Sequence, residues 1–408
     1  MKPSARHLLL TKRGAAWLEG FDEVDKPMAR ELSGALSLVS LSEFERSLIK
    51  LVLERTEASS KVALYSAREF EKCLSFEENV GECESGLDAT PRGSDIGSEG
   101  RTAHIARQIA RTSNAKFVLH PSISKLRALA VDQIIIIDDL LGTGNRCLAY
   151  LEELWKSASL KSWWSYHLIK FSVLAYAGTE DAIALIRRHN AAPEVCVHRY
   201  CPTISSLSWS PERRSAARAF CRKYAKRWQL HGRELGYENT ASLLVFEHGC
   251  PNNVPPVFWS AAKKAPATWQ ALFHGRSASG EVALAFPHEF ESQTPVSTLL
   301  SAGRWRLAET VDEVAHRPLS ANMLVFLSLI HKGRRRLETL SQATGLDARQ
   351  TRELLESCIA AGFITPLYRI TSAGLAEILG ASKIRRSGQN RVPELGPEDY
   401  YPTALRGR

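Results

Sequence analysis

A run of four consecutive isoleucines, at positions 134–137, constrains the fold most strongly. Every position of the run is apolar, as in a strand that is buried on both faces of a sheet. Segments with strand-like and helix-like patterns alternate around it, which predicts an α/β domain with a mostly parallel sheet. The predicted strands are 61–65, 117–119, 134–138, 171–176, 195–198 and 243–246, and the predicted helices are 99–112, 145–155, 179–189 and 211–229.

The chain has 408 residues, which is too long for one ordinary hydrophobic core. Residues 1–60 have helical periodicity, and Ser42 with Glu45 three residues later predicts a helix N-terminus there. We therefore predict an N-terminal helical segment over 1–60, an α/β domain over 61–260, a connector or cap over 261–317, a second domain over 318–381 and a basic tail over 382–408.

Composition narrows the class of protein further. The formal net charge of +9 permits binding to nucleic acid or another polyanion without requiring it. The eight cysteines form no Cys-x-x-Cys pair and have no zinc-ligand spacing, which indicates reduced thiols rather than a disulfide framework or a zinc site. No apolar run approaches the roughly 18 residues of a membrane span. We expect a cytoplasmic protein without a membrane partner, and the oligomer state stays open.

A pair of carboxylates and a glycine-rich turn follow the isoleucine strand. Asp138 and Asp139 are followed by Gly142-Thr143-Gly144, and a helix is predicted from Asn145. In an open α/β sheet, ligands bind beyond the carboxyl ends of the strands. The turn and the helix N-terminus offer backbone N–H groups to a phosphate, and the two acids can accept hydrogen bonds from ribose hydroxyls. The pattern predicts a ribose-phosphate site.

This segment resembles the phosphoribosyl-pyrophosphate (PRPP) signature of type I phosphoribosyltransferases. The resemblance implies that Asp138 and Asp139 hold the ribose hydroxyls and that Mg²⁺, bound with PRPP, reaches these acids only indirectly. The residues that would wrap the 5-phosphate are Leu141, Gly142, Thr143, Gly144, Asn145 and Arg146. Arg146 departs from the signature, because many members have threonine at its place. A guanidinium also binds phosphate, so the departure bears on catalysis more than on binding.

Two alternatives to a ligand site are consistent with the same residues. An acid pair can cap a glycine turn without any ligand. A Walker B strand can end in similar residues, but it requires an upstream Gly-x-x-x-x-Gly-Lys-Ser/Thr motif, which the chain lacks.

Three further segments are candidate walls of the site. Arg68 follows strand 61–65 and is a candidate pyrophosphate contact, or else a surface arginine paired with Glu69 or Glu71. Residues 79–100 correspond in position to the lid that closes over PRPP, or form a plain insertion. Residues 248–259 resemble a His-Gly-x-Pro-x-Asn segment of phosphoribosyltransferase-like effectors in bacterial conflict systems, and alternatively form a rigid proline-rich loop. The candidate substrate contacts there are His248, Asn252, Asn253 and Trp259.

Residues 318–380 have a winged-helix pattern. Helices are predicted over 319–331, 337–344 and 347–361, followed by a strand at 367–370 and a helix capped by Thr371. The candidate nucleic-acid contacts are Arg334, Arg335, Arg336, Arg349 and Arg352. Acidic residues on the predicted recognition helix weaken the case for insertion into a groove, and winged helices also bind proteins.

The combined organisation resembles effector proteins that accompany some bacterial retrons and act against phage. The resemblance implies a toxin whose winged helix binds a reverse transcriptase or its DNA–RNA hybrid (msDNA), and whose target is a nucleotide, a base or a nucleic acid. An alternative is a PRPP-responsive winged-helix transcription regulator without catalysis, although the known example has its winged helix at the N-terminus. A housekeeping salvage enzyme is a third possibility, which the C-terminal addition argues against. Whether the site transfers a phosphoribosyl group stays open.

Overall fold

The computed structural model describes residues 8–67, 98–112, 115–278, 280–286 and 321–379. These residues form two compact units. The first contains residues 8–286 together with 335–353, and the second contains 321–334 together with 354–379. The acid pair lies in the first unit.

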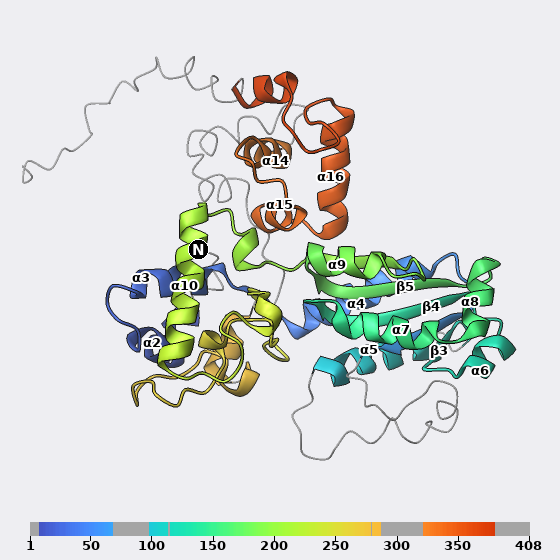
Figure 1. Cartoon of the computed structure of the whole chain (residues 1–408), viewed down its shortest axis with the longest axis horizontal. Helices are drawn as coiled ribbons and strands as arrows, with labels where there is room; N and C mark the ends of the chain where they lie inside the picture. The colour runs from blue at the N-terminus through green and yellow to red at the C-terminus, as the bar shows by residue number, and fades with distance from the viewer. Residues whose placement is uncertain (1–7, 68–97, 113–114, 279, 287–320, 380–408) are drawn as a thin grey trace, which may run out of the picture. The chain divides into compact units, whose positions relative to one another are not determined.

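A five-stranded parallel sheet forms the centre of the first unit (Figure 1). Its strands lie in the order β3-β2-β4-β5-β6, so that the isoleucine strand is central. In register, Ile136 lies between Tyr65 and Val173. The strands are β2 (Val62–Ser66), β3 (Phe117–Leu119), β4 (Gln133–Leu141), β5 (Lys170–Gly178) and β6 (Glu194–Tyr200). The predicted α/β class with a mostly parallel sheet is confirmed.

Helices cover both faces of this sheet. Ile134 and Ile136 pack in one core with α6 (Ile123–Ala128), α7 (Asn145–Trp155), α8 (Ala158–Ser165) and α9 (Glu180–Arg187). Ile135 and Ile137 pack in another core with α4 (Leu41–Thr56) and α5 (Ser98–Thr112). The alternation along β4 follows from the two-residue period of a strand. It explains why every isoleucine of the run is buried.

A second, two-stranded sheet corrects two sequence predictions. Strand β1 (Ser37–Val39) interrupts the segment 1–60, which was predicted to be helical throughout. It pairs in parallel with β7 (Leu244–Phe246), which therefore does not join the main sheet. The predicted cap at Ser42 is also wrong, because α4 begins after Ser40, whose hydroxyl accepts from the N–H of Glu43.

A third core packs beside the two-stranded sheet within the same unit. It joins α2 (Lys12–Glu19) and α3 (Lys26–Ala35) to the long helix α10 (Pro211–Arg227). Aromatic rings dominate it, and Trp17, Phe21 and Trp228 contact one another or Phe258. Short 3₁₀ turns connect the rest: η2 (Ile204–Ser206), η3 (Tyr237–Asn239), η4 (Pro256–Phe258), η5 (His274–Arg276) and η6 (Gly280–Ala285).

The C-terminal elements follow the winged-helix order. They are α14 (Ala321–His331), α15 (Leu337–Thr344), α16 (Ala348–Ala360) and a helix over 372–379 that Thr371 caps through the N–H of Gly374. The predicted wing strand at 367–370 is reduced to one antiparallel bridge between Ile364 and Ile370. Within the described part of the chain, none of the helices has the length and apolar character to cross a membrane.

Candidate functional site

The acid pair occupies positions 138 and 139 of strand β4, which ends at Leu141. Asp138 and Asp139 are 2% and 5% exposed. Asp138 continues the strand face of Ile136, and its Oδ2 lies 3.6 Å from the Sγ of Cys147 on α7. The charge of Asp139 acts both on Asp138 and on the imidazole of His248. The N–H of Asp139 donates to Oδ1 of Asp138, and the N–H of Leu140 donates to Oδ1 of Asp139. Two buried carboxylates are thus held on adjacent residues.

Arg146 forms an ion pair with the first acid. Its Nη1 lies 3.2 Å from Oδ1 of Asp138. Burial and the neighbouring charge of Asp139 raise the pKa of Asp138 well above its usual range, and the guanidinium opposes that rise. Arg146 therefore stabilises a negative charge on Asp138 in the absence of a ligand.

The turn after β4 has the geometry of a phosphate loop, defined here as residues 141–146. Gly144 is left-handed, with φ 83°, and forms the N-cap of α7. This backbone conformation favours glycine. The free N–H groups at the N-terminus of the 11-residue helix α7 therefore lie next to the phosphate loop. The hydroxyl of Thr179 donates to the carbonyl of Gly142 over 2.9 Å and accepts from the N–H of Ala182. The phosphate loop is thus fixed to the start of α9.

His248 lies on the Asp139 side of the sheet. Its ring stacks on Phe246, with centroids 4.8 Å apart, and contacts Phe44 at 4.6 Å. Both ring nitrogens are buried and find no hydrogen-bond partner among the described residues. Burial lowers the pKa of His248 to about 4, while the charge of Asp139 acts to raise it. The imidazole is neutral near pH 7 and is held close to the acid pair.

The other predicted contacts occupy different surroundings. Asn253 is buried and packs on the phosphate loop, because a Cβ added to Gly142 would lie 2.4 Å from its Nδ2. Asn252 is exposed. Trp259 is 9% exposed in the core of the α10 region, and its indole N–H donates to the carbonyl of Val254. Arg68 and most of the predicted lid at 79–100 lie outside the described residues.

Two of the five arginines predicted to contact nucleic acid face other side chains of the first unit. Arg336 forms ion pairs with Glu180 and Asp181 at the start of α9. The Nε of Arg352 donates to the hydroxyl of Tyr200 on β6 over 3.1 Å. Arg349 pairs with Glu353 one helical turn further along α16. Arg334 and Arg335 lie in the segment 332–336 that precedes α15. Nucleic-acid contact stays a prediction for all five.

The start of α15 and the start of α9 exchange hydrogen bonds. The N–H of Glu180 donates to Oε1 of Glu338 over 2.6 Å, and the N–H of Leu337 donates to Oε1 of Glu180. Each carboxylate thus satisfies a free N–H at the N-terminus of the other helix. Glu338 is 1% exposed, and burial raises its pKa to about 7. No pattern in the sequence predicts this pairing, although Thr179 followed by two acids is a recognisable helix start.

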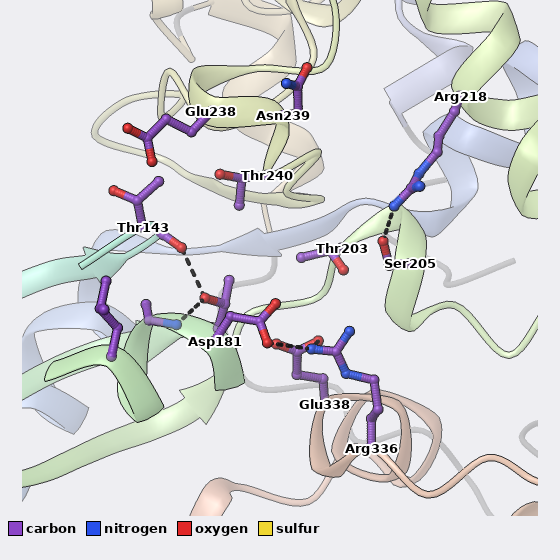
Figure 2. A pocket seen from close by; sticks show the side chains of 14 residues that line it. Thr143, Asp181, Thr203, Ser205, Arg218, Glu238, Asn239, Thr240, Arg336 and Glu338 are labelled. Carbon is purple, nitrogen blue, oxygen red and sulfur yellow. Dashed lines mark hydrogen bonds and ion pairs between the residues drawn. The ribbon is translucent and has the colours of Figure 1, made fainter. Parts of the chain in front are cut away.

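A cavity of about 340 Å³ lies beside the phosphate loop (Figure 2). Its walls come from the phosphate loop, the start of α9, the turns η2 and η3, α10 and the start of α15. Thr143 is the phosphate-loop side chain that lines it, whereas the acid pair does not. The described residues contain no cluster of three or more His, Cys, Asp or Glu side chains that could hold a metal ion.

A central parallel strand that carries two acids near its carboxyl end, followed by a left-handed glycine and a helix N-terminus, defines a phosphoribosyltransferase-like protein. A family model described as PRTase-CE matches residues 15–274, so the chain belongs to this family. A second model, described as wHTH-PRTase associated, matches residues 324–407, and the protein therefore carries a C-terminal winged helix. No curated protein and no solved structure matches the chain.

Proposed function

We propose that the protein is a phosphoribosyltransferase-like toxin of a bacterial anti-phage defence system of the retron type. Its phosphate loop binds PRPP or a related nucleotide, and its winged helix keeps it in check through a reverse transcriptase and the msDNA hybrid. The buried acid pair before the left-handed Gly144 loop carries the proposal. The retron link rests on the likeness of the domain order to such effectors.

Different residues of the chain bind different parts of the ligand. Asp138 and Asp139 accept hydrogen bonds from the ribose hydroxyls, and the N–H groups at the start of α7 bind the 5-phosphate. The neutral imidazole of His248, with its unpartnered nitrogens, is available to the acceptor group. Mg²⁺ bound with PRPP would supply charge neutralisation at the pyrophosphate. The two acids alone form no complete ligand set, and Arg146 already neutralises one of them.

Inducible expression tests the toxin and its site together. We expect growth arrest with the wild-type chain and normal growth with the double variant Asp138→Asn/Asp139→Asn. The matched control is Glu57→Gln/Glu356→Gln, which removes the same charge from two exposed positions and should remain toxic. Co-expression of the reverse transcriptase and its hybrid should restore growth. Toxicity that survives the acid-pair variant would refute the role of the site.

Calorimetry with PRPP and Mg²⁺ tests the ligand directly. The wild-type chain should bind PRPP, and the acid-pair variant should lose at least about tenfold in affinity, since each charge-assisted hydrogen bond is worth roughly 1.5–3 kcal/mol. A wild-type chain that binds no PRPP would mean that the family fold has been kept without this ligand.

The ion pair between Arg146 and Asp138 favours a second candidate, a winged-helix regulator that binds PRPP without catalysis. An internal cation on the ribose acid suits reversible ligand sensing better than turnover. Sequence-specific duplex binding that PRPP releases, without growth arrest, would support this regulator and exclude the toxin.

A further inference from the structure

The cavity beside the phosphate loop contains an arginine whose charge has no carboxylate partner among the described residues. Arg218 projects into it from α10, and its guanidinium contacts the hydroxyl of Ser205 (Figure 2). Its Nε is buried and has no hydrogen-bond partner in the part of the chain that is described. A buried, unpaired N–H of a guanidinium is costly unless something accepts from it.

The acidic residues that line the same cavity already have partners. Glu238 accepts from the side-chain amide of Asn145 over 3.0 Å. Asp181 is paired with Arg336 at 3.2 Å. Glu338 accepts from the N–H of Glu180 and lies 3.8 Å from Arg336. Arg336 is shared by Asp181 and Glu338, and Glu238 is bonded only to a neutral amide, so Arg218 is the lining cation that has no carboxylate partner among the described residues.

The remaining walls are suited to a polar ligand of nucleotide size. The hydroxyl-bearing side chains of Thr143, Thr203 and Thr240 line the cavity, and Leu185 adds an apolar side chain. The volume of about 340 Å³ lies within the range of roughly 300–1,000 Å³ for small-molecule sites. A guanidinium surrounded by hydroxyls matches a phosphate attached to a polyol or nucleoside.

We propose that this cavity is a second ligand site, which binds a phosphomonoester of a nucleoside or sugar with its phosphate on Arg218. It is separate from the acid pair, which does not line it, and it shares only the wall formed by the phosphate loop. The site is independent of the proposed chemistry at Asp138 and Asp139. The occupant would also touch Arg336 and Glu338, which belong to the start of α15.

Calorimetry on the full chain with AMP, ribose 5-phosphate and adenosine tests the site. We expect AMP to bind and adenosine to bind at least about tenfold more weakly, because the phosphate provides the charge-assisted contacts. Ribose 5-phosphate distinguishes the two sources of the phosphate: binding as tight as that of AMP identifies a sugar phosphate, and weaker binding identifies a nucleotide. A wild-type chain that binds neither phosphate at millimolar concentration would overturn the proposal.

Variants locate the binding. Arg218→Ala should weaken AMP at least about tenfold, while Arg222→Ala, an arginine on the same helix that is paired with Glu234, should leave the affinity unchanged. Leu185→Trp is the second variant, since it fills the cavity from α9 without touching Arg218 and should also abolish binding. AMP binding that is unaffected by both substitutions would place the ligand elsewhere and refute the proposal.

The acid-pair variant separates this site from the proposed PRPP site. Asp138→Asn/Asp139→Asn should keep its affinity for AMP even as it loses PRPP. Loss of both ligands in this variant would show that they share one site. That result would refute the second site, whereas the proposed PRPP site would stand.

Discussion

The guanidinium of Arg146 lies on the carboxylate of Asp138, with Nη1 and Oδ1 3.2 Å apart. The Asp138 side chain is 3% exposed and that of Arg146 is 32% exposed, so the pair joins a buried acid to a partly solvated cation. Burial raises the pKa of Asp138, and the guanidinium counteracts that effect. A ribose hydroxyl that binds Asp138 must therefore compete with Arg146.

We predict that Arg146→Thr strengthens PRPP binding by about tenfold at pH 8, because the ligand no longer displaces an internal partner. The loss of the cation also raises the pKa of Asp138, so the gain should diminish as pH falls and the acid becomes protonated. Calorimetry of both chains at pH 6 and pH 8 measures this. Arg146→Lys, which keeps the charge, is the control. Weaker binding at both pH values would instead mean that Arg146 turns to the phosphate.

Gly142 should tolerate no side chain while Asn253 keeps its position. A Cβ at residue 142 would lie 2.4 Å from Nδ2 and 2.6 Å from Cγ of Asn253, which itself donates to the hydroxyl of Thr240. We expect Gly142→Ala to lower the free energy of unfolding by roughly 1–3 kcal/mol through overpacking. Urea denaturation measures the change.

A double-mutant cycle is the control for this clash. Adding Asn253→Gly to Gly142→Ala removes the colliding atoms, so the two changes together should cost less than the sum of their separate effects. Strict additivity would show that the two side chains do not meet.

Trp259 distinguishes packing from ligand stacking. Because its ring is buried in the α10 core and its N–H is bonded to Val254, Trp259→Ala should lower the free energy of unfolding by about 3–5 kcal/mol. Trp259→Leu, which keeps an apolar side chain but no aromatic face, should cost less and leave PRPP affinity unchanged. A large loss of PRPP affinity in a stably folded Trp259→Leu chain would instead support the stacking role that the sequence predicts.

The sequence predicted the elements whose signal is local. Ile134–Ile137 indicated a central buried strand, and Gly142 to Asn145 indicated the loop and helix start, because apolar runs and helix caps depend on neighbouring residues. In the parallel sheet, β4 pairs with β2 and β5, and Ile136 lies between Tyr65 and Val173.

Long-range pairings could not be predicted in the same way. Strand β1 has three residues and is defined by its pairing with β7, about two hundred positions later. The contact between Arg146 and Asp138 forms because the phosphate loop brings the start of α7 back beside β4. The eight-residue spacing of the two side chains does not determine the rotamer of Arg146. An aromatic side chain beside a proline-rich turn suits either a core or a ligand site, so the sequence alone does not predict that Trp259 packs in the core.

Glu338 should make stability depend on pH. Its pKa rises from 4.5 to about 7 on folding, so the folded chain holds the proton more tightly than the unfolded chain does. The free energy of unfolding should therefore fall as the pH rises from about 4.5 to about 7, by roughly 3 kcal/mol. Glu338→Gln keeps an acceptor for the N–H of Glu180 but cannot ionise, and should remove this part of the pH dependence. Thermal unfolding of both chains at pH 5 and pH 8 measures the difference, with the exposed Glu356→Gln as control. Identical pH profiles for wild type and Glu338→Gln would show that the carboxyl titrates normally and that the contact between α9 and α15 does not depend on its protonation.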